Sequence, residues 1–182
     1  VLDLDAAVDG DLVVWGVDNV FKEYRVERGD VDSVWDSAHL VVEAEYRTGA
    51  QEQLYIEPQG MVATASPEGG VVVRGSMQCP YYIQKALGPL FDLPAERIRV
   101  IQEATGGGFG GKEEYPSMVA GHAALLAWKS GKPVKILYDR EEDMAVTTKR
   151  HPSRTRHRTA VDANGRLLAM EVDFVIDGGA YV

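Results

Sequence analysis

The stretch Thr105–Glu114 reads TGGGFGGKEE and holds five glycines within the six positions 106–111. Glycine has no Cβ, so it lets the main chain approach another group closely and adopt conformations that other residues avoid. A tight turn alone rarely needs glycine at this density. We therefore interpret the stretch as a loop that approaches a ligand, and the rest of the chain as the frame that holds it.

Two phosphate-binding patterns fit these residues. Gly106, Gly108 and Gly111 satisfy G-x-G-x-x-G, which is typical of dinucleotide-binding domains, and residues 106–112 satisfy the G-x-x-x-x-G-K of P-loop enzymes. The P-loop requires Ser or Thr after its lysine to hold magnesium, but Glu113 occupies that position. A carboxylate there would repel the phosphates, so the sequence argues against a P-loop.

The dinucleotide pattern has a suitable context. Residues 97–104 alternate like a strand, Glu113–Ser130 reads as a helix, and Val134–Tyr138 reads as a second strand. A pyrophosphate binds at a helix start because the amides and the dipole there favour negative charge. Glu113 and Glu114 would lie in that first turn and repel it, so a Rossmann-type NAD-binding domain stays open as the weaker alternative.

Composition narrows the class of protein. The chain has 182 residues, 45% hydrophobic and 26% charged, which is ordinary for a globular protein. Its net charge of −9 argues against nucleic acid or an anionic membrane as partner. The single cysteine, Cys79, excludes an internal disulfide and suits a reducing compartment, so we expect a cytoplasmic protein. No membrane-spanning run or signal peptide is recognisable, and the start at Val1 suggests a piece of a longer polypeptide.

The order of patterns predicts an α+β fold of mixed strands and hairpins with two main helices. Turn residues between apolar runs predict hairpins at 61–74 and 154–176, and Leu40–Tyr46 alternates like a half-buried strand. The helices are expected at Pro80–Phe91, ended or kinked before Pro89, and at Glu113–Ser130. Interspersed hairpins are typical of α+β rather than of repeated βαβ units. We expect residues 1–182 to be one fragment of a larger region, with residues 1–20 as a linker or peripheral segment.

Few residues outside the loop suggest chemistry. The four histidines show no metal-ligand spacing, and Cys79 is interpreted as a small buried residue. Glu141–Asp143 is interpreted as the solvated start of a helix. Gln78, between a strand and a helix, is a cap or turn residue on the residues alone. No catalytic triad or acid–base carboxylate pair can be assembled from spacing.

A set of short motifs accompanies the loop. They are Leu54–Pro58 (LYIEP), Lys132–Val134 (KPV), Asp139–Met144 (DREEDM) and Arg150–Pro152 (RHP). Together with the glycine stretch, they resemble the motifs of the molybdenum hydroxylases of the xanthine dehydrogenase and aldehyde oxidase family. The motifs occur in the same order as in that family, and the resemblance extends from about Val20 to Tyr181. The chain is similar to the first part of the molybdopterin-binding region of the large subunit. The resemblance implies that the loop's ligand is molybdenum with its pterin.

The resemblance also implies roles for individual residues. Gly108, Phe109 and Gly110 would bind the cofactor, with the main chain of Phe109 and Gly110 beside molybdenum and its oxygen ligand. Gln78 would form a hydrogen bond near a molybdenum oxygen. Glu113 would line the substrate pocket, and a carboxylate there favours a purine-like N-heterocycle, since aldehyde-oxidising relatives tend to carry an apolar residue.

The implied reaction is hydroxylation with oxygen from water, after which electrons leave through 2Fe–2S clusters to FAD. Those groups are expected in partner domains or subunits, and the family's general-base glutamate is expected in segments beyond Val182. The isolated chain is therefore expected to be inactive. Oxidation of aldehydes or of other heterocycles such as nicotinate, and a non-catalytic interaction module, are the remaining alternatives.

Overall fold

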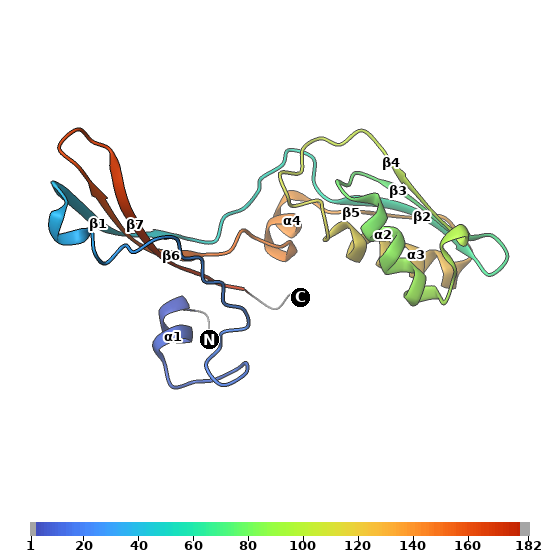
Figure 1. Cartoon of the computed structure of the whole chain (residues 1–182). Helices are drawn as coiled ribbons and strands as arrows, with labels where there is room; N and C mark the ends of the chain where they lie inside the picture. Colours follow the sequence, from blue (N-terminus) through green and yellow to red (C-terminus); the bar gives the residue numbers. More distant parts are fainter. Residues whose placement is uncertain (1–2, 179–182) are drawn as a thin grey trace. The chain divides into compact units, whose positions relative to one another are not determined.

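The computed structural model describes residues 3–178, so Tyr181, near the end of the family resemblance, lies outside the described residues. The chain divides into two compact units, Val1–Gln51 with His151–Val182, and Glu52–Arg150 (Figure 1). Both contain helices and sheets, which confirms the predicted α+β class.

The first unit is built on a three-stranded antiparallel sheet of order β1-β6-β7. Its elements are α1 (Leu4–Asp9), the 3-10 turn η1 (Trp35–Ser37), β1 (Leu40–Thr48), β6 (Ser153–Val161) and β7 (Leu167–Ile176). The predicted hairpin of β6 and β7 is confirmed. Its turn is fixed by the Asp162 carboxylate, which accepts hydrogen bonds from the amides of Asn164 (2.8 Å) and Arg166 (2.9 Å).

The second unit holds a four-stranded sheet of order β4-β3-β2-β5. Its strands are β2 (Gly60–Ser66), β3 (Gly70–Gly75), β4 (Ile98–Gln102) and β5 (Val134–Leu137). β2 runs antiparallel to β3 and β5, and β3 runs parallel to β4. The hairpin of β2 and β3 is confirmed, and Gly70 completes its turn at φ 77° with no room for a Cβ against the Arg97 carbonyl.

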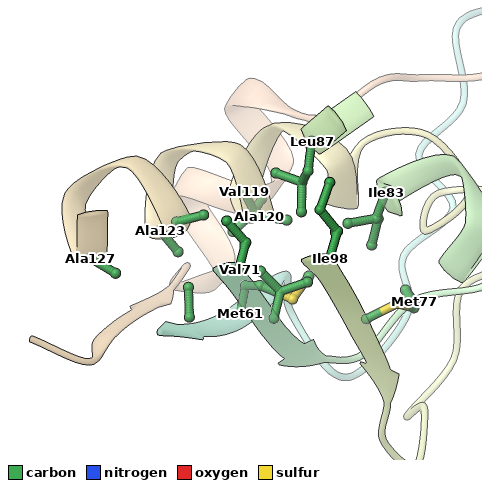
Figure 2. Packing of buried hydrophobic residues seen from close by; sticks show 13 residues of the cluster. Met61, Val71, Met77, Ile83, Leu87, Ile98, Val119, Ala120, Ala123 and Ala127 are labelled. Atoms are coloured by element: carbon green, nitrogen blue, oxygen red, sulfur yellow. The ribbon is translucent and has the colours of Figure 1, made fainter. Parts of the chain in front are cut away.

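Two helices, α2 (Pro80–Phe91) and α3 (Pro116–Ser130), lie against this sheet and each other (Figure 1). The shorter elements are η2 (Ala95–Arg97) and α4 (Arg140–Val146). Small residues on α3 let it approach the strands closely, and Figure 2 shows them facing the sheet side chains. The core cluster consists of Met61, Ala63, Val71, Val73, Met77, Ile83, Leu87, Ile98, Val119, Ala120, Ala123, Ala124 and Ala127.

Two helix predictions were wrong in detail. α2 continues through Pro89 to Phe91, because the core contacts of Leu87 and Phe91 outweigh the hydrogen bond that proline cannot make. α3 begins at Pro116 rather than Glu113. Proline suits a first helical turn, and the residues before it follow the path of the glycine loop instead of the helix.

The sheet topology argues against the dinucleotide-binding alternative. The loop and α3 connect β4 to β5, and these strands form the two opposite edges of the sheet. In a Rossmann unit, the strands that flank the glycine loop and its helix belong to one parallel βαβ unit. Here β3 and β2 separate them.

Candidate functional site

The glycine loop leaves β4 and reaches α3 in a conformation that few residues adopt. Gly107 and Gly110 have φ values of 97° and 94°, and Phe109 lies at 51°. A left-handed conformation is unfavourable for phenylalanine, and such strain persists only where the surroundings fix it. Phe109 is nevertheless 76% exposed. The fixing groups therefore act on the main chain of the loop.

Gln78 is the first of these groups. Its Oε1 accepts hydrogen bonds from the amides of Gly110 (3.0 Å) and Lys112 (3.1 Å), and its own main-chain amide donates to the Lys112 carbonyl (2.6 Å). The interpretation of Gln78 as a helix cap was wrong, because the half-buried Cys79 is the N-cap of α2. Gln78 lies at a bend before it, and its side chain reaches across to the loop. Among the described residues, no hydrogen bond engages its Nε2.

The glycines of the loop have different neighbours. A Cβ on Gly108 would lie 2.3 Å from Oε1 of Gln78, and one on Gly111 would lie 2.5 Å from Cε1 of Tyr55. These two positions require glycine because protein atoms approach them. A Cβ on Gly110 would have no neighbour within 4 Å. The open side of the loop is therefore at Gly110, next to the exposed Phe109.

Lys112 is the second fixing group, and it points into the protein. The residue is fully buried, with Nζ 3.0 Å from Oε2 of Glu57, 2.9 Å from Oγ of Ser76 and 4.8 Å from the centre of the Tyr55 ring. A P-loop lysine must reach the phosphates of its ligand. This ammonium group is committed to an internal ion pair, so the loop lacks the cation that phosphate binding would need.

Glu57 connects the lysine to the start of the loop. Its Oε2 also accepts from the Gly106 amide (2.7 Å), and its amide donates to the Gly106 carbonyl (3.2 Å). Burial acts to raise the pKa of Glu57, but hydrogen bonds from Ser76, the Gly106 amide and Lys112 outweigh burial and hold that pKa below its usual range. The carboxylate is therefore ionised at neutral pH.

A third group, Tyr55 with Gln59 and Asp143, fixes the end of the loop. Nε2 of Gln59 donates to the Gly111 carbonyl (2.9 Å) and to the Tyr55 hydroxyl (2.8 Å), and that hydroxyl donates to Oδ1 of Asp143 (2.7 Å). Asp143 is fully buried, so the interpretation of Glu141–Asp143 as solvated was wrong at this residue. Burial, followed by the neighbouring Asp143, raises the pKa of Tyr55.

Sequence reasoning missed these partners of the loop, of which Tyr55 and Asp143 are buried and Glu57 is half-buried. Tyr55, Glu57 and Asp143 are polar residues in short irregular or helical segments, where solvent exposure is the usual expectation. Their positions in the LYIEP and DREEDM motifs could have indicated that these residues contribute to the site, because both motifs accompany the glycine stretch in the family resemblance.

Glu113 is exposed and has no hydrogen bond or ion pair among the described residues. It precedes Tyr115, the N-cap of α3, so it lies outside the first helical turn. The prediction that Glu113 and Glu114 lie in that turn was therefore wrong. Sheet topology and the burial of Lys112 argue against a bound pyrophosphate instead.

The described residues hold no cluster of three or more His, Cys, Asp or Glu side chains that could bind a metal ion. Within residues 3–178, no helix is long and apolar enough to cross a membrane.

Comparison with known proteins identifies the family. The model of the molybdopterin cofactor-binding domain matches residues 16–182. The chain is 38% identical to the nicotinate dehydrogenase large molybdopterin subunit of Eubacterium barkeri, covering 92% of this chain and 39% of that protein. It is 37% identical to a probable xanthine dehydrogenase subunit of Bacillus subtilis, covering 90% of this chain and 22% of that protein. The chain thus spans well under half of these relatives.

Solved structures of two oxidoreductases have a similar fold. The aldehyde oxidoreductase of Desulfovibrio gigas superposes with a TM-score of 0.81 at 25% identity, over 96% of this chain and 19% of that one. Quinoline 2-oxidoreductase of Pseudomonas putida superposes with a TM-score of 0.78 at 25% identity, over 97% of this chain and 23% of that one.

The ion pair predicts an asymmetry between two substitutions. Glu57→Gln leaves a fully buried ammonium without its counter-ion, which should lower the free energy of unfolding by up to about 3–5 kcal/mol. Lys112→Met leaves a carboxylate whose side chain is 40% exposed and can be solvated, so the loss should be nearer 1.5–3 kcal/mol, roughly the value of hydrogen bonds to a charged group. Urea unfolding of both variants measures the difference; a larger loss for Lys112→Met would contradict it.

The lowered pKa of Glu57 predicts a pH dependence. A carboxylate with a depressed folded-state pKa contributes stability that is fully present above its unfolded pKa, about 4.3, and is lost as the pH falls through the folded-state pKa. The stability gap between wild type and Glu57→Gln should therefore be constant near neutrality and shrink below about pH 4. Thermal unfolding across this range tests it, and an unchanged gap at about pH 3 would show that Glu57 does not titrate as described.

Proposed function

Since the chain belongs to the family of molybdopterin cofactor-binding domains, we propose that its glycine loop forms one wall of the molybdenum site of a larger hydroxylase. The observation that carries this proposal is the fixed loop itself. Gln78 orients the amides that follow Phe109, while the side at Gly110 is left open.

The residues present fit such a cofactor. A molybdenum centre bears oxygen ligands and is anionic, so a protein wall beside it needs hydrogen-bond donors and room for a close approach. Among the described residues, no hydrogen bond engages the amides of Gly107, Gly108 and Phe109. Together with Nε2 of Gln78, they form a set of neutral donors around the loop. No protein carboxylate has to coordinate the metal.

The cofactor, when bound, supplies the oxidation of an electron-poor carbon with oxygen taken from water. This chain's own residues bind and orient it. We assign cofactor binding to Gly108, Phe109, Gly110 and Gln78, with the main chain of Phe109 and Gly110 beside the metal. Gln78 also has a catalytic role as a hydrogen-bond donor near the reacting oxygen.

The proposed substrate is a purine-like N-heterocycle, oriented by Glu113. Support comes from the exposed carboxylate of Glu113, which is unpaired among the described residues, and from the match to a probable xanthine dehydrogenase subunit. A nicotinate-like heterocycle is the second candidate, because the nicotinate dehydrogenase subunit has slightly higher identity. Aldehyde oxidation is the third, given the similarity to aldehyde oxidases.

We further propose that residues 1–182 form one fragment of the cofactor-binding region, with residues 1–20 as a peripheral segment. The remaining region, and domains or subunits that carry 2Fe–2S clusters and FAD, complete the enzyme. The relative named as a large molybdopterin subunit supports such a division. A cytoplasmic location is part of the same proposal.

Metal analysis tests the proposed site. The intact protein that contains this chain should hold about one molybdenum per polypeptide, with pterin, because the cofactor is enclosed by several walls. The isolated 182-residue chain should hold none and oxidise nothing, since one wall gives little affinity. Stoichiometric molybdenum with activity in the isolated chain would contradict the single-wall account, and an intact protein without molybdenum would refute the function.

Titration with nucleotides tests the nucleotide-binding alternative. We expect no heat of specific binding with NAD, NADP or ATP, because Lys112 is buried in an ion pair and cannot reach a phosphate. Calorimetric titration of wild type measures this. Micromolar binding that disappears in Gly108→Ala would restore the dinucleotide interpretation.

Substitutions of Glu113 test the substrate assignment in the intact enzyme. A hydrogen bond to a charged group is worth about 1.5–3 kcal/mol, so Glu113→Gln and Glu113→Val should lose about ten- to a hundredfold in kcat/KM on xanthine or hypoxanthine. Aromatic aldehydes should lose less or gain. Because Glu113 lies outside α3 and is unpaired among the described residues, thermal stability should not change. Equal losses on purine and aldehyde would remove Glu113 from the substrate pocket.

A further inference from the structure

We propose that Lys112 is a positioning residue that, through Glu57, presets the glycine loop and the amide of Gln78 for the ligand. The three residues Glu57, Ser76 and Lys112 are called the loop lock below. The identity of the ligand rests on the proposed function, but the lock itself rests on contacts within the chain.

One oxygen atom of the loop lock, Oε2 of Glu57, binds residues at both ends of the glycine loop. Oε2 of Glu57 accepts from the Gly106 amide at the first glycine (2.7 Å) and from Nζ of Lys112 just after the last glycine (3.0 Å). The two ends of residues 106–112 cannot separate without breaking this pair. Closing a loop in this way removes chain entropy, which is largest where glycine is frequent.

The lock reaches the binding side of the loop through Gln78. The main chain of Lys112 exchanges two hydrogen bonds with Gln78, from the Lys112 amide to Oε1 (3.1 Å) and from the Gln78 amide to the Lys112 carbonyl (2.6 Å). The same Oε1 accepts from Gly110 (3.0 Å). Anchoring Lys112 therefore fixes the side-chain amide of Gln78 and the Gly110 amide together.

Lys112 cannot act on a ligand directly. Its side chain is 0% exposed, and its ammonium has Glu57, Ser76 and the Tyr55 ring as neighbours. A buried ion pair adds little net stability compared with apolar residues of the same volume, and conformational specificity is one reason to retain such a pair. A loop with five glycines has many alternative conformations, so a specific anchor has a clear use here.

Hydrogen exchange in the intact protein tests the lock. In Lys112→Met, the amides of Gly106, Gly110 and residue 112 should exchange about ten- to a hundredfold faster, the factor expected when a hydrogen bond to a charged group is lost. The amides of β2 and β3 exchange through global unfolding, so their rates should rise only by the factor that corresponds to the loss of unfolding free energy measured in urea. The loop amides should exchange by a local opening whose free energy lies below the global value, and this contrast separates positioning from general destabilisation.

Lys149→Met is the matched control. It removes a second lysine–carboxylate pair of the same unit, Lys149–Glu52 (2.7 Å), in which the side chains are 28% and 14% exposed and no hydrogen bond reaches residues 106–112. We expect unchanged exchange in the loop. If Lys112→Met does not fold, Ser76→Ala removes one acceptor of Nζ without leaving an unpaired charge, and should accelerate the same loop amides a few-fold.

Wild-type exchange rates in the loop of Lys112→Met, loop amides that exchange there only through global unfolding, or the same loop response in Lys149→Met would each overturn the proposal. Wild type and variants are compared at equal molybdenum content, measured for each protein, so these outcomes are separate from the proposed function. An intact wild-type protein without molybdenum would refute the function, while a loop that loosens in Lys112→Met would still establish the lock.

Discussion

The conformation of the loop depends on a buried ammonium that pairs with a carboxylate. A six-residue stretch with five glycines gains little from side-chain packing and has much more conformational freedom than an ordinary loop of that length. The Lys112–Glu57 pair supplies the missing restraint from inside the protein. Because the ammonium is fully buried, loss of its partners would cost a large free energy. The pair therefore restrains the main chain of residues 106–112.

The frame around the pair places each remaining anchor. Gln78 lies between β3 and α2, and Asp143 enters the interior from α4, so the end of an inner strand and a short helix both contribute to one loop. These anchors act on the loop from its protein side, Asp143 through Tyr55 and Gln59, and glycine is needed there for close approach at Gly108 and Gly111. The opposite side keeps Gly110 and Phe109 accessible. Such a surface can approach a bulky cofactor with main-chain donors.

The sequence predicted the elements of the fold well and the anchors poorly. Hairpins and helices follow from local turn chemistry and periodicity, so the 61–74 and 154–176 hairpins were placed correctly. The start of α3 was misplaced because the path of the loop, a tertiary effect, decides it. The burial of Lys112 depends on its contact with Glu57, and the burial of Asp143 depends on its contact with Tyr55. The two partners of each contact are 55 and 88 positions apart in the sequence, respectively, so no local pattern encodes them. The proposed ligand of the loop came from the family motifs rather than from a physical argument on the residues.

The most direct test of the account is anomalous diffraction from crystals of the intact protein, recorded at the molybdenum absorption edge. The account predicts one anomalous peak beside the main chain of Phe109 and Gly110, within reach of the Gln78 amide, with Lys112 still paired to Glu57. A molybdenum peak remote from this loop, or a nucleotide phosphate held by it with Lys112 turned outward, would contradict the account.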